Sequence, residues 1–129
     1  MQLKAVLLDL DGTLVDTAPD LVAVLNAVLK ENGQTAVPYA IARNAVSDGV
    51  FGLLRLGFGP DLQKTDLESL RRRFIDIYME YTPIKSIFFN GIINILNNLE
   101  ESKIKWGIVT NKPAKMTLPL LEALGICDR

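Results

Sequence analysis

The sequence contains no histidine and only one cysteine, and both shortages limit the chemistry that it can support. Without histidine, a Ser-His-Asp triad, a Cys-His pair and a histidine-ligated zinc site are excluded. General acid–base catalysis would then depend on carboxylates, lysine or tyrosine. Cys127 cannot form a disulfide within the chain, and a reducing compartment explains this most simply.

Long hydrophobic runs and an excess of either charge are also missing. The apolar start is interrupted by Lys4 and leads into acidic residues, which argues against a signal peptide. No stretch approaches the roughly 18 uncharged apolar residues that a membrane span requires. The 14 basic and 15 acidic residues nearly cancel, so no overall field favours nucleic acid or an anionic membrane. We therefore expect a soluble cytoplasmic protein without nucleic-acid or membrane partners.

The residues that are present predict an α/β fold. Apolar runs predict two buried strands, at 3–8 and 105–110, and apolar residues at helical spacing predict the intervening helices. These helices are expected at 20–32, at 40–56, from a Thr65/Glu68 capping box to Pro83, at 91–102 and at 114–124 around Pro119. Right-handed crossovers would place both strands in one parallel sheet, with ligands bound beyond their carboxyl ends.

The stretch "DLDGTLVDT" (residues 9–17) follows the first strand and carries the strongest chemical signal. Asp9 and Asp11 are two apart, so at a strand end they project to one side and repel each other. Either a bound Mg²⁺ or a proton on one carboxyl would relieve this repulsion. Gly12 permits a tight turn, and Thr13 adds a hydroxyl that suits an anion. The alternative is an ordinary acidic turn.

This stretch, together with the preceding "KAVLL", resembles the first motif of the haloacid dehalogenase (HAD) superfamily. "WGIVTNKP" resembles the second motif of that superfamily, and "FFNGIINILNNLE" resembles its entry helix, although Asn90 stands where members usually have proline. The resemblance implies a Rossmannoid parallel α/β sheet with an inserted all-helical cap. It also implies a partial core at 1–16 and 85–129 and a cap at 17–84.

The resemblance further implies a Mg²⁺-dependent phosphatase that works through an aspartyl-phosphate. Asp9 would be the nucleophile and a Mg²⁺ ligand, and Asp11 would be the general acid/base and ligate Mg²⁺ through its carbonyl. The expected phosphate-binding residues are Gly12, Thr13, Thr110 and Asn111. Candidate substrate contacts are Asp16, Arg43 and Ser47, whereas most of the run Arg71–Arg73 is expected to be a solvated helix face.

The motifs look most like the phosphoglycolate phosphatase branch, so 2-phosphoglycolate is the first substrate expected. N-acetylmuramic acid 6-phosphate and sugar phosphates are the alternatives within the family. The family's later lysine and its Gly-Asp…Asp acids are not found, which implies an N-terminal part with an incomplete, truncated core. We hypothesise weak Mg²⁺ binding, poor turnover and self-association through the exposed core surface. A phospho-accepting signalling module and a non-catalytic scaffold are the competing classes.

Overall fold

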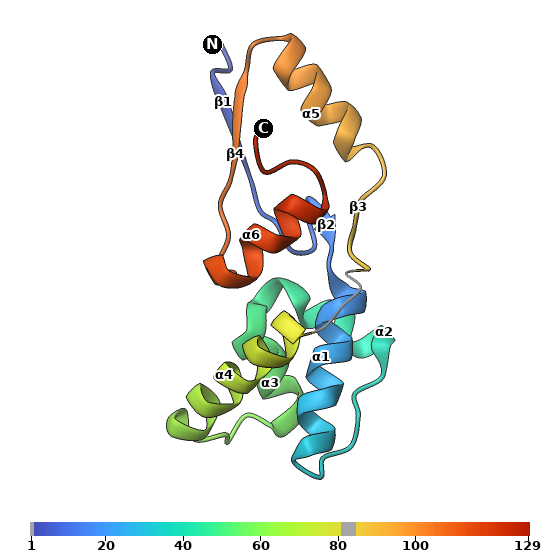
Figure 1. Ribbon diagram of the computed structural model, residues 1–129, viewed down its shortest axis with the longest axis vertical. Helices are drawn as coiled ribbons and strands as arrows, with labels where there is room; N and C mark the ends of the chain where they lie inside the picture. Colours follow the sequence, from blue (N-terminus) through green and yellow to red (C-terminus); the bar gives the residue numbers. More distant parts are fainter. Residues whose placement is uncertain (1, 81–84) are drawn as a thin grey trace.

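The computed structural model describes residues 2–80 and 85–129 and follows the expected order of strand, helical segment, strand and helix (Figure 1). The elements are β1 (Ala5–Leu8), β2 (Val15–Asp16), α1 (Ala18–Glu31), α2 (Tyr39–Ala42), the 3₁₀ helix η1 (Arg43–Asp48), α3 (Gly49–Phe58), α4 (Lys64–Glu80), β3 (Ile87–Phe88), α5 (Ile92–Glu101), β4 (Lys105–Ile108) and α6 (Ala114–Ala123). The expected helix stop at Pro83 lies outside the described residues.

The predicted parallel pairing of the two strands is confirmed. β1 pairs with β4 from Ala5 opposite Lys105 to Leu8 opposite Ile108. A second, antiparallel pair joins β2 to β3, and sequence reasoning missed it. Each of its strands has only two residues, which is too short to show an alternating pattern.

The prediction that these strands are buried on both faces is wrong. Leu8, Trp106 and Ile108 pack against a small apolar cluster formed with α5 and α6. Leu7, which points to the opposite face, is 72% exposed. The described sheet has two strands and apolar packing on one face. The residues of β1 therefore alternate between exposed and partly buried, instead of all being buried as predicted.

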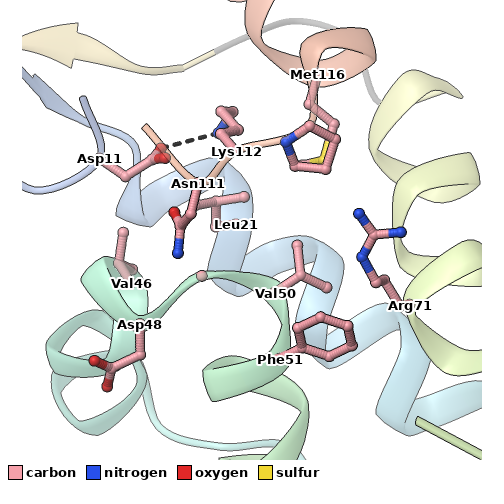
Figure 2. A pocket seen from close by; sticks show the side chains of 12 residues that line it. Asp11, Leu21, Val46, Asp48, Val50, Phe51, Arg71, Asn111, Lys112 and Met116 are labelled. Carbon is pink, nitrogen blue, oxygen red and sulfur yellow. Dashed lines mark hydrogen bonds and ion pairs between the residues drawn. The ribbon is translucent and has the colours of Figure 1, made fainter. Parts of the chain in front are cut away.

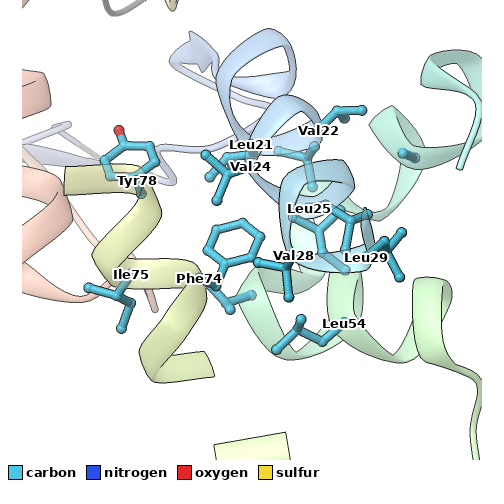
Figure 3. Packing of buried hydrophobic residues seen from close by; sticks show 14 of the residues in the cluster. Leu21, Val22, Val24, Leu25, Val28, Leu29, Leu54, Phe74, Ile75 and Tyr78 are labelled. Atoms are coloured by element: carbon cyan, nitrogen blue, oxygen red, sulfur yellow. The ribbon is translucent and has the colours of Figure 1, made fainter. Parts of the chain in front are cut away.

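Helices α1, α3 and α4 form a separate helical bundle in the lower half of Figure 1. Phe74 of α4 is fully buried and points toward Val24 and Val28 of α1 (Figure 3). Met116 of α6 joins this cluster, which connects the bundle to the α/β part. The limits 1–16 with 85–129 and 17–84 remain a prediction, and two distinct apolar clusters are the observation that favours them.

The single helix predicted at 40–56 is wrong, because three short helices replace it. α2 leads into η1, and Gly49 then adopts a positive φ of 74° where α3 begins. This break redirects the chain, so that Ser47 reaches back to the acidic loop. The expected capping box is also wrong, because the Leu67 amide bonds to the Gln63 carbonyl and Thr65 lies inside the first turn of α4.

One buried carboxylate joins α1 to the segment that precedes β3. Asp20 is 1% exposed and accepts hydrogen bonds from the Lys85 amide at 2.8 Å and the Ser86 amide at 3.0 Å. The Ser86 hydroxyl donates a further bond at 2.8 Å. Because these donors satisfy the charge, Asp20 fixes the return of the chain to the α/β part.

Candidate active site

The acidic loop begins where β1 ends and is held by its buried leucines. Leu10 and Leu14 are fully buried, as expected for residues that pack beneath the loop. The Leu10 carbonyl accepts hydrogen bonds from the amides of residues 13, 14 and 15. This tight turn brings Asp9 to the surface and leaves Asp11 only 7% exposed, so the two carboxylates lie in different environments.

Asp11 is held by two side chains that donate to the same oxygen atom. Lys112 Nζ lies 2.9 Å from Asp11 Oδ1, and the side chains of the two residues are 3% and 9% exposed (Figure 2). The Thr17 hydroxyl donates to the same Oδ1 at 2.7 Å. Thr17 does precede α1, but its hydroxyl bonds to Asp11 and does not cap the helix.

Tyr78 of α4 extends this arrangement into the helical bundle. The Lys112 ammonium lies 5.2 Å from the centre of the Tyr78 ring, which is a favourable cation–π distance. The buried Tyr78 hydroxyl has no hydrogen-bond partner among residues 2–80 and 85–129. Burial, followed by the negative charges of Asp20 and Asp11, raises the pKa of Tyr78 and keeps the phenol neutral.

Gly12 lies in close contact with η1, the 3₁₀ helix that carries Ser47. Its φ is +81°, and a Cβ there would lie 2.7 Å from Ser47 Oγ. The positive φ confirms the tight turn that the sequence predicts at Gly12, and the Ser47 side chain is its close neighbour. Gly12 and the candidate substrate residues Asp16, Arg43 and Ser47 line one cavity of about 230 Å³. The structure thus brings these four residues together.

The remaining predicted residues lie around the two strand ends. The Thr13 hydroxyl donates to Asp9 Oδ2 at a long 3.5 Å. Thr110 follows β4, and its hydroxyl accepts a hydrogen bond from the Lys112 amide at 3.1 Å. Asn111 is exposed and packs against Gly49, where a Cβ would come within 3.0 Å of Asn111 Nδ2.

A second cavity, of about 170 Å³, lies between the strand ends and the bundle (Figure 2). Asp11, Asn111 and Lys112 line one side of it, and Asp48, Phe51 and Arg71 line the other. The Arg71 guanidinium lies 5.5 Å from the centre of the Phe51 ring. Arg72 and Arg73 are exposed, as expected for most of this run, whereas Arg71 is half-buried beside this cavity.

The oxygen atoms of the acidic loop suit Mg²⁺. Asp9 offers an exposed carboxylate, and the Asp11 carbonyl receives a long 3.4 Å bond from the Ser47 hydroxyl. Across the described ranges, no three acidic, cysteine or histidine side chains gather as a complete metal cluster. Mg²⁺ characteristically takes one or two carboxylates and completes its shell with water and phosphate, so this donor set fits it.

Comparison with known proteins identifies the family. Residues 6–129 match the haloacid dehalogenase-like hydrolase family, and the chain belongs to it. Among curated relatives, an N-acetylmuramic acid 6-phosphate phosphatase of Pseudomonas aeruginosa is 39% identical over all of this chain and 57% of its own length. A phosphoglycolate phosphatase of Xanthomonas campestris is 38% identical over 95% of this chain and 55% of its own length.

Solved structures agree with this assignment. The crystal structure of a predicted phosphoglycolate phosphatase from Haemophilus somnus 129PT is 26% identical, with a TM-score of 0.80 over 98% of this chain and 60% of that one. The chain therefore spans somewhat more than half the length of the relatives it matches. No helix in the described ranges is long and apolar enough to cross a membrane.

Sequence reasoning missed several residues that surround Asp11. The place of Lys112 just after the predicted strand at 105–110 was a usable signal for it. Thr17 directly precedes α1 and Tyr78 lies on the buried face of α4, so the local pattern around each residue indicates a structural role. Nothing local indicates the pairing of Lys112 with Asp11, which are 101 residues apart.

Proposed function

We propose that the chain is the part of a phosphomonoester hydrolase that carries its nucleophile, its general acid/base and its helical cap. The observation that supports this most is the contrast between the two acids of one loop. Among residues 2–80 and 85–129, the exposed Asp9 carboxylate has one long side-chain hydrogen bond, whereas Asp11 is buried and held by two short ones. An available carboxylate beside a positioned one suits nucleophilic attack followed by proton transfer.

In the first step, an Asp9 carboxylate oxygen bonds to phosphorus as the bond to the leaving oxygen breaks. The Asp11 carboxyl gives its proton to that oxygen, and an alcohol departs. A bound Mg²⁺, held by the Asp9 carboxylate and the Asp11 carbonyl, would offset the negative charge of phosphate and acids. Thr110 and the Asn111 amide would hold phosphoryl oxygens, with Gly12 and Thr13 completing the turn around them.

In the second step, Asp11 accepts a proton from water as that water attacks the phosphorus of the aspartyl-phosphate. Inorganic phosphate leaves, and the Asp9 carboxylate is regenerated. The Asp11 carboxyl thus begins and ends the cycle protonated. The cavity between the strand ends and the bundle would exclude bulk water during both transfers.

We propose N-acetylmuramic acid 6-phosphate as the substrate, ahead of 2-phosphoglycolate and sugar phosphates. The sequence motifs favoured 2-phosphoglycolate. However, a curated relative that matches the whole of this chain is an N-acetylmuramic acid 6-phosphate phosphatase. A second such relative, from Pseudomonas putida, is 37% identical over the whole chain. N-acetylmuramic acid 6-phosphate and 2-phosphoglycolate each carry a carboxylate, which Arg43 could bind bidentately beside Asp16 and Ser47.

The test measures Mg²⁺-dependent phosphate release from N-acetylmuramic acid 6-phosphate and from 2-phosphoglycolate. It uses this chain and, in parallel, a longer polypeptide that contains it. Asp9→Asn should lower kcat on the order of 10³-fold or more. Asp61→Asn changes an exposed acid in the loop before α4 and serves as the matched control. Activity that survives Asp9→Asn would contradict the assigned nucleophile, and a higher kcat/KM for 2-phosphoglycolate would reverse the substrate order.

A further inference from the structure

We propose that Lys112 is a positioning residue that holds the Asp11 carboxylate ready for proton transfer. This inference rests on the proposed phosphatase function. Lys112 and Thr17 both donate to Asp11 Oδ1, at 2.9 Å and 2.7 Å. Within residues 2–80 and 85–129, no hydrogen bond reaches Asp11 Oδ2, and Asp11 lines the cavity between the strand ends and the bundle. One oxygen is therefore fixed while the other stays available to carry the transferred proton.

The backbone on both sides of Lys112 is fixed, which makes the residue a firm anchor. Its amide donates to the Thr110 hydroxyl at 3.1 Å, and its carbonyl accepts a bond from the Thr117 hydroxyl at 3.3 Å. Pro113 follows directly and immediately precedes α6. Because these bonds already fix the backbone, binding Asp11 costs only the rotamer freedom of the lysine side chain itself.

Burial makes the pairing obligatory for the lysine. An ammonium whose side chain is 3% exposed cannot keep its charge without partners that replace water. Asp11 Oδ1 supplies one partner, and the face of the Tyr78 ring supplies another. Because Tyr78 belongs to α4, the position of Asp11 depends on the docking of the helical bundle as well as on the loop after β4.

This role differs from phosphate binding, and the leaving group can separate the two. An alkyl phosphate needs a proton from Asp11 as its alcohol departs, whereas p-nitrophenolate departs readily without one. Misplacing Asp11 should therefore slow the first chemical step with an alkyl phosphate and spare that step with p-nitrophenyl phosphate. Loss of a phosphate-binding cation would weaken the binding of both substrates alike.

The decisive measurement is single-turnover cleavage of 2-phosphoglycolate and of p-nitrophenyl phosphate, which isolates the first step. Lys112→Met should slow 2-phosphoglycolate cleavage about 10- to 100-fold and p-nitrophenyl phosphate cleavage less than about threefold. Lys112→Arg should recover most of the loss, since a guanidinium can bind the same oxygen. The matched control is Lys115→Met, which removes an exposed lysine three residues further along.

Equal slowing of both substrates by Lys112→Met would overturn the proposal, as would a rise in KM alone. If Lys112→Met does not fold, Thr17→Val removes the other donor to Oδ1 with little change in volume. Thr17→Val should also slow cleavage of 2-phosphoglycolate more than cleavage of p-nitrophenyl phosphate, but by a smaller factor than Lys112→Met. If Thr17→Val leaves the ratio of the two cleavage rates at the wild-type value, the result contradicts the proposal.

A readout that is independent of turnover separates this inference from the proposed function. The carboxyl ¹³C resonance of Asp11, assigned with Asp11→Asn, should shift in Lys112→Met and stay near its original position in Lys115→Met. If wild type cleaves no phosphomonoester but this shift is seen, the proposed function fails and the positioning contact stands. If the chain is an active phosphatase and the resonance does not move, the positioning role fails alone.

Discussion

The helical bundle and the α/β part of the chain bury their apolar residues to very different extents. In the bundle, α1, α3 and α4 face one another, and Leu25, Leu53 and Phe74 are fully buried. In the α/β part, the sheet packs on one face, so that Leu7 is 72% and Val109 59% exposed. Three amphipathic helices can complete a core among themselves, whereas a two-stranded sheet with one covered face cannot.

The candidate active site lies where these two regions meet. Asp11 belongs to the loop after β1, Lys112 to the loop after β4, and Tyr78 to α4. The tightly packed bundle therefore contributes one side of a site whose chemical groups come from the more open region. Substitutions that destabilise one region and not the other should show how far the site depends on each region.

The largest expected effect comes from truncating the bundle core. Phe74→Ala should lower the free energy of unfolding by about 3–5 kcal/mol, since it removes a fully buried ring and leaves a cavity. The matched change in the open region, Leu7→Ala, should cost less than about 0.5 kcal/mol, because Leu7 is largely exposed. Urea unfolding followed by circular dichroism would measure both values.

A loss of more than about 2 kcal/mol for Leu7→Ala would contradict this comparison. It would mean that the outer face of the sheet is covered in solution, as the hypothesis of self-association requires. Sedimentation velocity on wild type and Leu7→Ala would distinguish the two cases. If a second copy covers this face, wild type should sediment as a dimer, and Leu7→Ala should weaken that association.

The elements that sequence reasoning predicted well are those with a long local pattern. The apolar spacing of α1 and α5 defined both helices within about two residues, and the acidic motif located Asp9 and Asp11 at a strand end. The failures depend on long-range contacts. Nothing in the residues around 43–48 predicts the 3₁₀ turn that brings Ser47 to Gly12. The exposure of Leu7 likewise depends on what covers the sheet and not on its own sequence.

The second prediction concerns the connection between the two regions. Asp20→Ala should lower the free energy of unfolding by about 1–3 kcal/mol, because the amides of Lys85 and Ser86 lose their acceptor. Asp76→Ala, which removes an exposed acid on α4, is the control and should change stability by less than about 0.5 kcal/mol. Equal effects of the two substitutions would show that Asp20 does not join the regions.

The smallest effect is a pH dependence that compares one surface ion pair from each region. In the bundle, Arg73 donates to Glu31 and lowers the pKa of that carboxyl below its usual 4.5. In the α/β part, Arg129 and then Trp106 lower the pKa of Glu100 in the same direction. A lowered pKa in the folded state adds stability above 4.5 that is lost as the pH falls through the folded value.

Glu31→Gln and Glu100→Gln should each flatten the decline of stability below about pH 4.5, measured by urea unfolding across that range. Both pairs lie at the surface, where water and ions screen them, so each effect should be small and should shrink further in high salt. Glu31 ties α1 to α4, and Glu100 ties α5 to the last residue, Arg129. If the two regions unfold as one unit, both substitutions will affect the same transition. If the better-packed bundle unfolds separately, Glu31→Gln will alter its transition alone.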